Sequence, residues 1–242
     1  MEILSRARDL ENEKNVELLI DYDNLVNVDA STVDFKMNVA EGNHFLAAKD
    51  VQFNQNVQVE IIGQNNLLVI GGRANLSGTK FYIRGNDCVI LLGSNVALRN
   101  DRLTAVGDKA VVVLGRSTTM VGGGQILAES PSSEIVVKDD CMFAHGVVLR
   151  TSDGHTIWDR ETGELINRPG SILVQSHVWL ANSARVSKGS AIGTGCVIAQ
   201  NSLVNGVLEP NSIYAGTPAR KVRGGVVWSR TQSLDGVPKR FR

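Results

Sequence analysis

The chain has 242 residues, of which 43% are apolar and 21% are charged, so it can bury a sizeable core and bulk disorder is excluded. Its 25 Lys and Arg side chains balance its 25 Asp and Glu side chains, which leaves no overall charge for binding nucleic acid or an anionic membrane. Glycine is frequent, at 24 residues, and aromatic residues make up only 5%. This composition favours many short strands joined by turns.

The first residues and the cysteines favour a cytoplasmic location. The opening sequence MEILSRARDLENEKN is too charged for a signal peptide. No run of the chain approaches the roughly 18 continuous apolar residues of a membrane-spanning helix. Cys88, Cys141 and Cys196 are far apart and form no CxxC pair, which favours a reducing compartment. We therefore expect a cytoplasmic protein with no membrane span and no nucleic acid partner.

Residues 1–24 differ from the rest of the chain. Leu4, Ala7 and Leu10 recur at helical spacing, which predicts a short N-terminal helix that acts as a cap. From residue 25 onward the pattern changes to short aliphatic runs separated by turn residues. The helix is thus expected to be an addition to a fold that is otherwise all-β.

Residues 25–150 contain aliphatic positions that recur every 22 residues. Two sets share the same phase, the second set lying six residues after the first: Ile70, Leu92 and Leu114, and then Leu76, Leu98 and Met120. Each member of the first set is followed by glycine. A six-residue step inside a longer repeat is typical of irregular coils in a solenoid, each coil carrying a loop of about four extra residues.

Residues 173–208 carry a regular six-residue repeat. Its aliphatic members are Val174, Leu180, Val186, Ile192, Ile198 and Val204. Mostly small residues stand four positions after each of them, which lets the chain turn a corner without a clash. The two periods together predict a parallel β-helix solenoid, in which stacked turns share one core. A β-sandwich with coincidental spacing is the alternative.

Residues 151–172, TSDGHTIWDRETGELINRPGSI, interrupt this ladder and have no period. They predict a polar loop that leaves the solenoid between two coils, and loops on a rigid scaffold often carry function. Residues 209–242 are expected to form a C-terminal cap and tail, because Pro210 and Pro218 cannot join a central strand. The whole chain, 1–242, is interpreted as one β-helix domain with these segments.

His155 lies within the loop, between Asp153 and Asp159. Histidine in a polar loop suits general base catalysis, since imidazole titrates near neutral pH and a carboxylate can fix its tautomer. Asp153 is a candidate to orient His155, because residues i and i+2 share a face of an extended chain. A backbone carbonyl could orient the ring instead. The simpler alternative is a surface histidine without a catalytic role.

Two other uses of these side chains were weighed. His145, His155 and His177 could meet as a zinc site, but no two of them are close in sequence, so no metal is predicted. The chain contains no glycine-rich phosphate-binding motif. A basic run near the C-terminus could contact the phosphate of a ligand such as coenzyme A, or could be a solvated surface. Its members are Arg220, Lys221 and Arg223.

From about Val137 to Trp228 the sequence resembles the hexapeptide-repeat acyltransferases. Within them it is similar to the sugar O-acetyltransferases, which include galactoside, maltoside and capsular polysaccharide enzymes. The resemblance is carried by SDGHTIWDRETGELIN at 152–167, HVWLAN at 177–182, the six-residue repeats and EPNSIYAGTPARKVR at 209–223. The spacing between His155 and Trp179 also matches that of capsular polysaccharide O-acetyltransferases, including those acting on polysialic acid.

This resemblance implies a left-handed β-helix that forms a homotrimer, uses acetyl-CoA and has active sites in the clefts between subunits. It makes His155 the general base and places Trp179 in the same site. Coenzyme A contacts, largely through the backbone, are implied at Ala181, Asn182, Gln200, Asn205 and Arg223, with Arg220 and Lys221 nearby. Gly206 stands where the family often has lysine, so a basic contact is missing there. The resemblance says nothing about the acceptor surface in residues 25–136.

The sequence is therefore interpreted as an acetyl-CoA-dependent O-acetyltransferase acting on a hydroxyl group of a sugar or surface polysaccharide. The acceptor oxygen would attack the thioester directly while His155 takes its proton, and backbone N–H groups would stabilise the oxyanion. An amino-sugar N-acetyltransferase would need the same base and cofactor. A metal-dependent lyase of the γ-carbonic-anhydrase kind and a non-catalytic scaffold are further alternatives, although a scaffold has no need of the loop.

Overall fold

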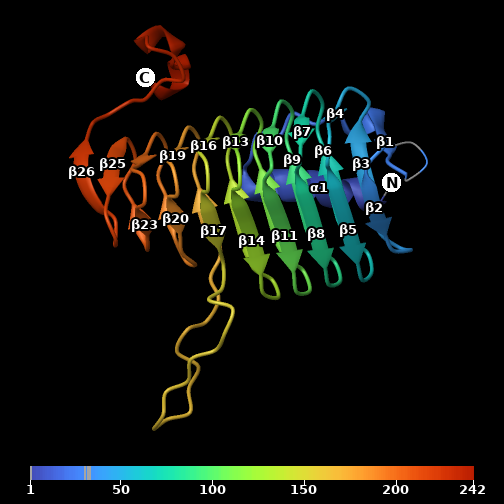
Figure 1. The fold of residues 1–242 in the computed structure, drawn as a ribbon, viewed down its shortest axis with the longest axis horizontal. Helices are drawn as coiled ribbons and strands as arrows, with labels where there is room; N and C mark the ends of the chain where they lie inside the picture. The colour runs from blue at the N-terminus through green and yellow to red at the C-terminus, as the bar shows by residue number, and fades with distance from the viewer. Residues whose placement is uncertain (1, 30, 32–33) are drawn as a thin grey trace.

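A computed structural model describes residues 2–29, 31 and 34–242 of the chain. The strands form three sheets wound around one axis, so that each coil adds one strand to each sheet in turn (Figure 1). Pairing is parallel throughout, except that β1–β3 and β25–β26 are antiparallel at the two ends. The all-β, parallel β-helix predicted from the sequence is confirmed.

The first sheet, sheet A, contains β1 (Leu25–Asn27), β3 (His44–Ala48), β6 (Leu67–Ile70), β9 (Val89–Leu92), β12 (Val111–Leu114), β15 (Glu134–Val137), β18 (Ile172–Val174), β21 (Ala191–Ile192) and β24 (Val207–Leu208). Sheet B contains β2 (Lys36–Val39), β5 (Gln58–Ile62), β8 (Lys80–Arg84), β11 (Arg102–Val106), β14 (Gln125–Glu129), β17 (Val148–Arg150), β20 (Arg185–Val186) and β23 (Leu203–Val204). Sheet C contains β4 (Gln52–Phe53), β7 (Asn75–Ser77), β10 (Ala97–Arg99), β13 (Thr119–Val121), β16 (Met142–Phe143), β19 (Trp179–Leu180), β22 (Val197–Ile198), β25 (Ser212–Ala215) and β26 (Arg220–Gly224).

Strand register explains both sequence periods. In the N-terminal coils Ile70 pairs with Leu92, and Leu92 with Leu114, so one coil consumes 22 residues. In the C-terminal coils Val174 pairs with Ile192, so one coil consumes three six-residue steps. All five side chains are fully buried along the inside of the solenoid. Each repeated aliphatic residue therefore stacks on its counterpart in the next coil and removes its apolar surface from water.

Glycine at the corner between sheets A and C is required by the closeness of neighbouring coils. A Cβ atom on Gly93 would lie 2.6 Å from the backbone nitrogen of Arg116, and one on Gly115 would lie 2.5 Å from that of Asp139. Backbone atoms of the next coil cannot move away without breaking the parallel ladder. This is the physical reason why glycine follows the aliphatic residue in the 22-residue repeat.

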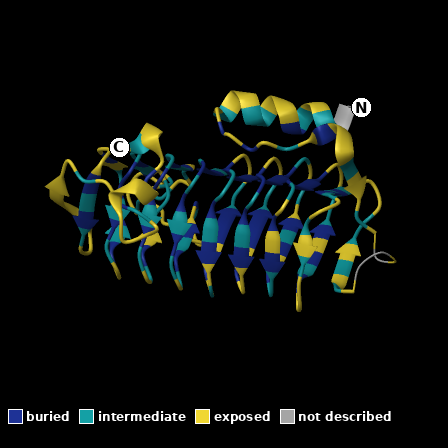
Figure 2. Cartoon of the chain, turned by 90° about the horizontal axis from the view of Figure 1, so that it is seen from above, coloured by how far each residue is buried: buried dark blue, intermediate teal, exposed yellow. Residues whose placement is uncertain are grey.

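Helix α1 (Glu2–Lys14) covers the outer face of sheet A, along which it runs (Figure 2). Ala7 and Leu18 are fully buried in a cluster with outward-facing side chains of sheet A, such as Leu67 and Val89. Lys14 Nζ pairs with a carboxylate oxygen of Glu134 at 2.8 Å. The N-terminal segment thus closes one of the three sides of the solenoid. Short 3₁₀ helices follow at Tyr22–Asn24, Leu234–Gly236 and Lys239–Phe241.

The predicted interruption begins where β17 ends, at Arg150, and lasts until β18 begins, at Ile172. Residues 151–171 leave the solenoid at the corner between sheets B and A and project away from it (Figure 1). An isolated antiparallel bridge joins Trp158 and Leu165, so the two arms of the loop run side by side. No helix among the described residues is long and apolar enough to cross a membrane.

Candidate functional site

His155 lies on the projecting loop and is exposed. Its backbone carbonyl accepts a hydrogen bond from Asn167 Nδ2 at 2.8 Å, and Asn167 Oδ1 accepts one from the Ile157 N–H at 2.6 Å. Asn167 thereby joins the two arms of the loop and fixes the backbone that carries His155. Within the described part of the chain no hydrogen bond occupies the imidazole, so the ring is available to a ligand or to another subunit.

Asp153 is held by groups other than His155. Its carboxylate forms an ion pair with Lys188 and accepts a hydrogen bond from Asn167 Nδ2 at 2.8 Å. These hydrogen bonds, first that of Lys188 and then that of Asn167, lower the pKa of Asp153. Lys188 Nζ also donates to the Asn167 carbonyl at 3.0 Å. Asp153 and Lys188 therefore anchor the base of the loop to the following coil, and the orienting role of Asp153 stays a prediction.

Lys188 and Asn167 were not predicted from the sequence. Lys188 lies 35 residues from Asp153 in the chain, at the corner between β20 and β21, and reaches the loop only because the coils stack. Asn167 stands near the end of the loop, where the amide of its side chain can serve both arms. The only feature of the sequence that pointed to Asn167 was its amide side chain near the end of a polar insertion.

Trp179 belongs to β19 in sheet C, where its side chain faces outward and is half-buried. Its ring centroid lies 6.0 Å from that of Trp228. His155 instead leaves from the corner between sheets B and A, which is opposite sheet C across the solenoid. A single chain therefore does not bring His155 and Trp179 together.

The residues predicted to contact coenzyme A fall into three places: two corners of the solenoid and the edge strand β26. Ala181, Asn182 and Gln200 lie at the corner between sheets C and B on successive coils, and the Asn201 N–H donates to the Asn182 carbonyl at 2.9 Å. Asn205 lies at the corner between sheets B and A, which is the corner from which the loop projects. The structure thus brings the first three residues together and separates Asn205 from them.

The predicted basic run forms β26, the edge strand of sheet C, and all of its residues are exposed. Lys221 Nζ forms an ion pair with Glu209 at 2.5 Å, and this hydrogen bond raises the pKa of Lys221. Neither Arg220 nor Arg223 is paired with a carboxylate among the described residues. These two guanidinium groups are therefore the ones free to meet a phosphate on this edge.

The C-terminal half of sheet C has an apolar outer face. Two adjacent rows of half-buried side chains run along it: Met142, Trp179, Val197 and Ile213, and beside them Ala144, Ala181, Ala199 and Ala215. Alanine on every coil keeps this face flat. A flat apolar face on an otherwise polar surface is typical of contact with another protein surface.

The three candidate metal-ligating histidines do not converge. His155 is on the loop, and His145 lies exposed at the corner between sheets C and B, where its ring packs over Gly122. His177 is buried and both of its ring nitrogens contact protein oxygens. Among the described residues no group of three His, Cys, Asp or Glu side chains is arranged to hold a metal ion.

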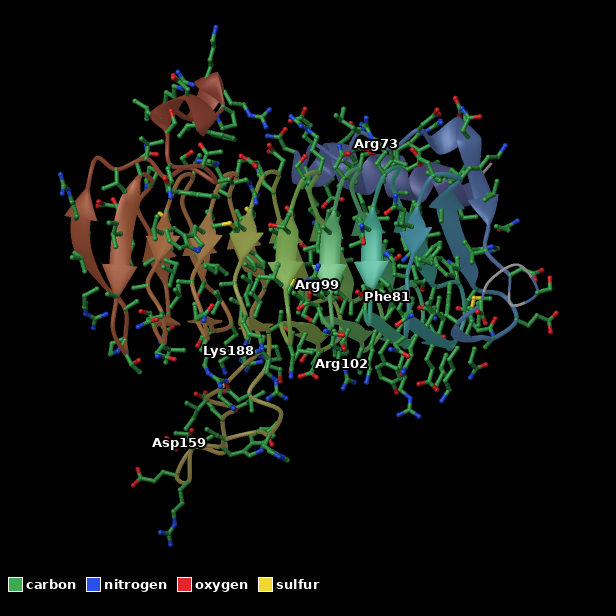
Figure 3. The ribbon with its side chains drawn as sticks, turned by 45° about the horizontal axis from the view of Figure 1, so that its top comes forward. Arg73, Phe81, Arg99, Arg102, Asp159 and Lys188 are labelled. Atoms are coloured by element: carbon green, nitrogen blue, oxygen red, sulfur yellow. The ribbon has the colours of Figure 1, made fainter. Side chains whose placement is uncertain are left out.

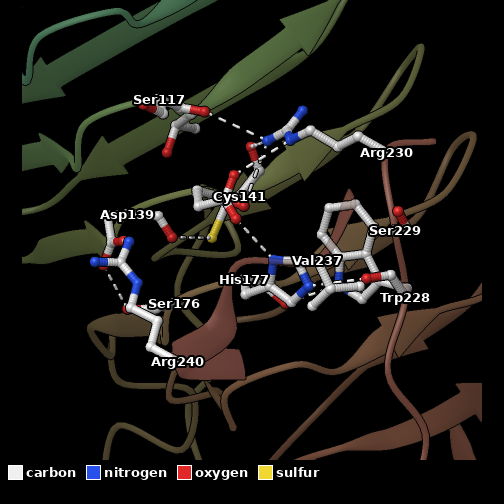
Figure 4. Close-up of polar contacts among 12 residues, drawn as sticks. Ser117, Asp139, Cys141, Ser176, His177, Trp228, Ser229, Arg230, Val237 and Arg240 are labelled. Carbon is white, nitrogen blue, oxygen red and sulfur yellow. Dashed lines mark hydrogen bonds and ion pairs between the residues drawn. The ribbon is translucent and has the colours of Figure 1, made fainter. Parts of the chain in front are cut away.

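His177 is the centre of a C-terminal clasp, formed with Asp140, Trp228 and Phe241. Figure 4 shows His177 beside Trp228, with Arg230 and Arg240 of the tail nearby. Its Nδ1 lies 2.8 Å from Asp140 Oδ2 and its Nε2 lies 3.0 Å from the Trp228 carbonyl oxygen. The indole N–H of Trp228 donates to the His177 carbonyl at 2.8 Å. The imidazole stacks between the rings of Trp228 and Phe241, at centroid distances of 4.2 and 4.6 Å.

Two arginines of the tail extend this clasp. Arg230 Nε lies 3.2 Å from Asp140 Oδ1, and its Nη2 donates to the Cys141 carbonyl at 2.9 Å. Arg240 pairs with Glu17 at 3.0 Å and also with Asp139. The clasp therefore joins the tail to coils on both sides of the loop and to the N-terminal segment. Its contacts are internal, which indicates a structural role for His177.

The cysteines are structural as well. Cys88, Cys141 and Cys196 are free and buried. Burial raises the pKa of the Cys141 thiol to about 12, so this side chain is not a thiolate near neutral pH. Its sulfur lies 3.2 Å from the Gln175 carbonyl of the next coil. These cysteines fill corners of the solenoid where a small apolar residue is needed.

Comparison of the sequence with curated proteins shows related acetyltransferases. A polysialic acid O-acetyltransferase of Escherichia coli O1:K1 is 29% identical over 146 residues, which are 60% of this chain and 46% of that protein. A polysialic acid O-acetyltransferase of Neisseria meningitidis is 29% identical over 133 residues, 54% of this chain and 60% of that protein. The chain thus spans about half the length of the curated relatives it matches. No family model matches the chain.

Comparison of the structure agrees with that of the sequence. The crystal structure of the polysialic acid O-acetyltransferase OatWY matches with a TM-score of 0.67 and 28% identity, over 84% of this chain and 90% of that one. The polysialic-acid-specific acetyltransferase NeuO shares the fold, with a TM-score of 0.57 and 24% identity, over 84% of this chain and 91% of that one. The resemblance to hexapeptide-repeat acetyltransferases and their left-handed β-helix is confirmed.

The clasp predicts a pH-dependent stability. Burial alone would raise the pKa of Asp140, but its hydrogen bond to His177 and the charge of Arg230 outweigh burial, and the pKa is lowered. A carboxylate with a lowered pKa in the folded state stabilises the fold above its unfolded pKa, and this contribution is lost as pH falls through the folded value. Urea unfolding should therefore show Asp140→Asn to be less stable than wild type by about 1–3 kcal/mol at pH 7. A second measurement below the ordinary aspartate pKa of about 3.9 should show a smaller difference.

Glu164→Gln is the matched control, because it removes an exposed carboxylate from the loop without touching the clasp. It should leave the unfolding midpoint unchanged at both pH values. An Asp140→Asn protein that unfolds at the wild-type urea concentration at pH 7 would show that the clasp adds nothing to stability.

Proposed function

We propose that this protein is an acetyl-CoA-dependent O-acetyltransferase that modifies a hydroxyl group of a capsular or other surface polysaccharide. The observation that carries the proposal is the match to OatWY along nearly the whole solenoid, at 28% identity. The exposed His155 on a loop anchored at its base supplies the group that such a reaction needs. The donor is coenzyme A carrying an acetyl group, as the sequence resemblance implies.

The chemistry requires one proton to be moved. The acceptor hydroxyl oxygen attacks the thioester carbonyl carbon, and His155 takes the hydroxyl proton as the C–O bond forms. The tetrahedral oxyanion then collapses, the C–S bond breaks, and the proton passes from His155 to the departing sulfur. Products are the acetyl ester and free coenzyme A, so the histidine returns to its starting state. Backbone N–H groups are the proposed donors to the oxyanion.

The complete site is proposed to lie between two copies of the chain in a homotrimer. Two observations support this. His155 and Trp179 lie on different sides of one solenoid, so a second copy is needed to join them. The flat apolar outer face of sheet C, around Trp179 and Ala181, offers a surface for that copy. Coenzyme A would then lie along the corner that carries Asn182 and Gln200, with Arg220 or Arg223 near a phosphate.

Replacing His155 tests the proposed base. His155→Ala should lower the rate of acetyl transfer by about 10²–10⁴-fold, the usual effect of losing a general base. The side chain is exposed on the loop, so folding and assembly should be unchanged. Mass spectrometry of polysialic acid incubated with acetyl-CoA measures the product, and an amine-bearing sugar tested in parallel distinguishes O- from N-acetylation.

His145→Ala is the control, since His145 is another exposed histidine, at a corner of the solenoid. It should retain most of the activity. A His155→Ala protein that still transfers acetyl groups at nearly the wild-type rate would remove His155 from the mechanism. If His145→Ala loses activity and His155→Ala does not, the general base is His145, at the corner between sheets C and B.

Mixing two inactive proteins tests the shared site. His155→Ala and Trp179→Ala trimers should each be nearly inactive, because every site lacks one of the two side chains. Random exchange of subunits at equal concentration should restore both side chains in roughly a quarter of the sites, and activity should recover accordingly. Activity is measured before and after mild dissociation and reassembly. A site contained within one chain would give no recovery.

A further inference from the structure

The N-terminal half of sheet B has a basic outer face that the proposed catalytic site does not use. Lys36 is in register with Gln58, Gln58 with Lys80, and Lys80 with Arg102, so these side chains form one row along the solenoid. Arg84 stands on the same face at the other end of β8. We call Lys36, Lys80, Arg84 and Arg102 the basic ladder. Figure 3 shows Arg102 on the side of the solenoid from which the loop projects.

The cations of the basic ladder are exposed, and none has an acidic partner among the described residues. No ion pair joins any of them to a carboxylate within the range of residues that the structure describes, whereas Lys14, Arg116 and Lys188 are all paired with carboxylates. One unpaired carboxylate, Glu60, also faces outward here, and Glu129 farther along is paired with Arg150 at 2.7 Å. The face therefore carries a clear excess of positive charge.

This arrangement works against the stability of the solenoid. Lys80 lies directly opposite Arg102 on the neighbouring strand, and strands of a sheet are about 4.8 Å apart. Like charges directly opposite one another in a sheet are destabilising. A basic face is also unsuited to burial against another subunit, because burying unpaired charges is costly. A ligand with negative charges at short intervals would remove this repulsion.

The neighbouring groups suit a sugar polymer. A groove of about 420 Å³ is lined by three of the ladder residues, Lys36, Lys80 and Arg102, and its other polar lining residues are Asn38, Gln58, Glu60 and Tyr82. Amide side chains can donate to and accept from sugar hydroxyl groups. Arg102 donates from Nε to Thr104 Oγ1 at 3.1 Å and lies over the ring of Tyr82 at 5.7 Å, which holds its guanidinium in place. A fixed guanidinium fork is matched to a carboxylate.

The face leads toward the loop. Sheet B continues from Arg102 through Gln125 in the same row, and its strand β17 ends at Arg150, where the loop begins. Arg150 lies beside the loop backbone, since a Cβ atom on Gly154 would be 2.9 Å from its Nη2. Gly154 directly precedes His155. A polymer lying along the basic ladder would therefore extend toward the residue proposed to activate its hydroxyl group.

We propose that the basic ladder on sheet B binds an anionic polysaccharide with one carboxylate on each sugar and leads it along the solenoid to the loop. This proposal rests on the proposed acetyltransferase function. It assigns the N-terminal coils, whose role the sequence resemblance does not explain, to holding the acceptor chain several sugars away from the reacting hydroxyl group.

The test compares two double variants with the same change of net charge. Lys80→Gln with Arg102→Gln removes the centre of the ladder. Lys49→Gln with Arg99→Gln removes two exposed cations from outside sheet B and is the control. Binding is measured by fluorescence anisotropy with labelled polymer of α2,8-linked sialic acid and with labelled polygalacturonate, in the absence of acetyl-CoA. The ladder variant should raise the Kd of at least one polymer by about tenfold, while the control variant should not.

Kinetics give a second measurement on the same proteins. The ladder variant should raise KM for the polymer by about tenfold, leave kcat unchanged and leave transfer to a sialic acid trimer unchanged, because a trimer is too short to span the face. Equal Kd values for the ladder and control variants would overturn the proposal, as would the failure of wild type to bind either polymer. Competition by a single-stranded oligonucleotide as strong as by the polymers would also overturn it.

The two proposals can fail separately. If wild type transfers acetyl to no sugar yet binds polymer through Lys80 and Arg102, the proposed enzymatic function is wrong and the binding surface stands. If wild type acetylates the polymer but the ladder variant has wild-type Kd and KM, the function stands and the acceptor lies on another face.

Discussion

Everything in this structure depends on the parallel hydrogen bonding between successive coils. Because each strand bonds to the strands one coil before and after it, neighbouring coils are held about 4.8 Å apart, and a residue can only stack on its own counterpart. Ile70, Leu92 and Leu114 form such a stack inside. The same register operates outside, so that the outward side chains of successive coils line up in rows along the axis, as Lys36, Gln58, Lys80 and Arg102 do. The rows differ in composition, which gives the solenoid chemically distinct faces.

The three faces of the solenoid suit different functions. Helix α1 and the segment after it cover sheet A from β3 to β18. The C-terminal half of sheet C is apolar and flat, which suits another subunit, and the N-terminal half of sheet B is basic, which suits an acidic polymer. The loop rises at the corner between sheets B and A, next to the basic side. The reaction is thus proposed to take place where the acceptor-binding face meets a subunit boundary.

The inside of the fold was predictable from the sequence, and much of the outside was not. The buried positions of Val174, Leu180 and Val186 could be predicted, because a buried row tolerates only aliphatic residues of similar volume and therefore repeats visibly in the sequence. Outward positions carry no such restriction, so Lys36 and Lys80 gave no periodic signal, although they stand two coils apart in one row. The loop was visible as a break in the period, and its candidate base was identified there. The partner of Asp153 was not, because Lys188 is near it only once two coils have stacked.

The C-terminal clasp has a consequence for how this fold tolerates change. Asp140 belongs to the coil before the loop and His177 to the coil after it, and their contact at 2.8 Å joins these two coils at the corner between sheets A and C, away from the corner at which the loop leaves. An insertion of some twenty residues would by itself weaken the stacking of the two coils, since closing a longer loop costs conformational entropy. Trp228 and Arg230 hold these coils from the opposite end of the chain. Because the tail holds the register of these coils, the loop does not have to. The sequence and length of the loop are therefore open to selection for new acceptors.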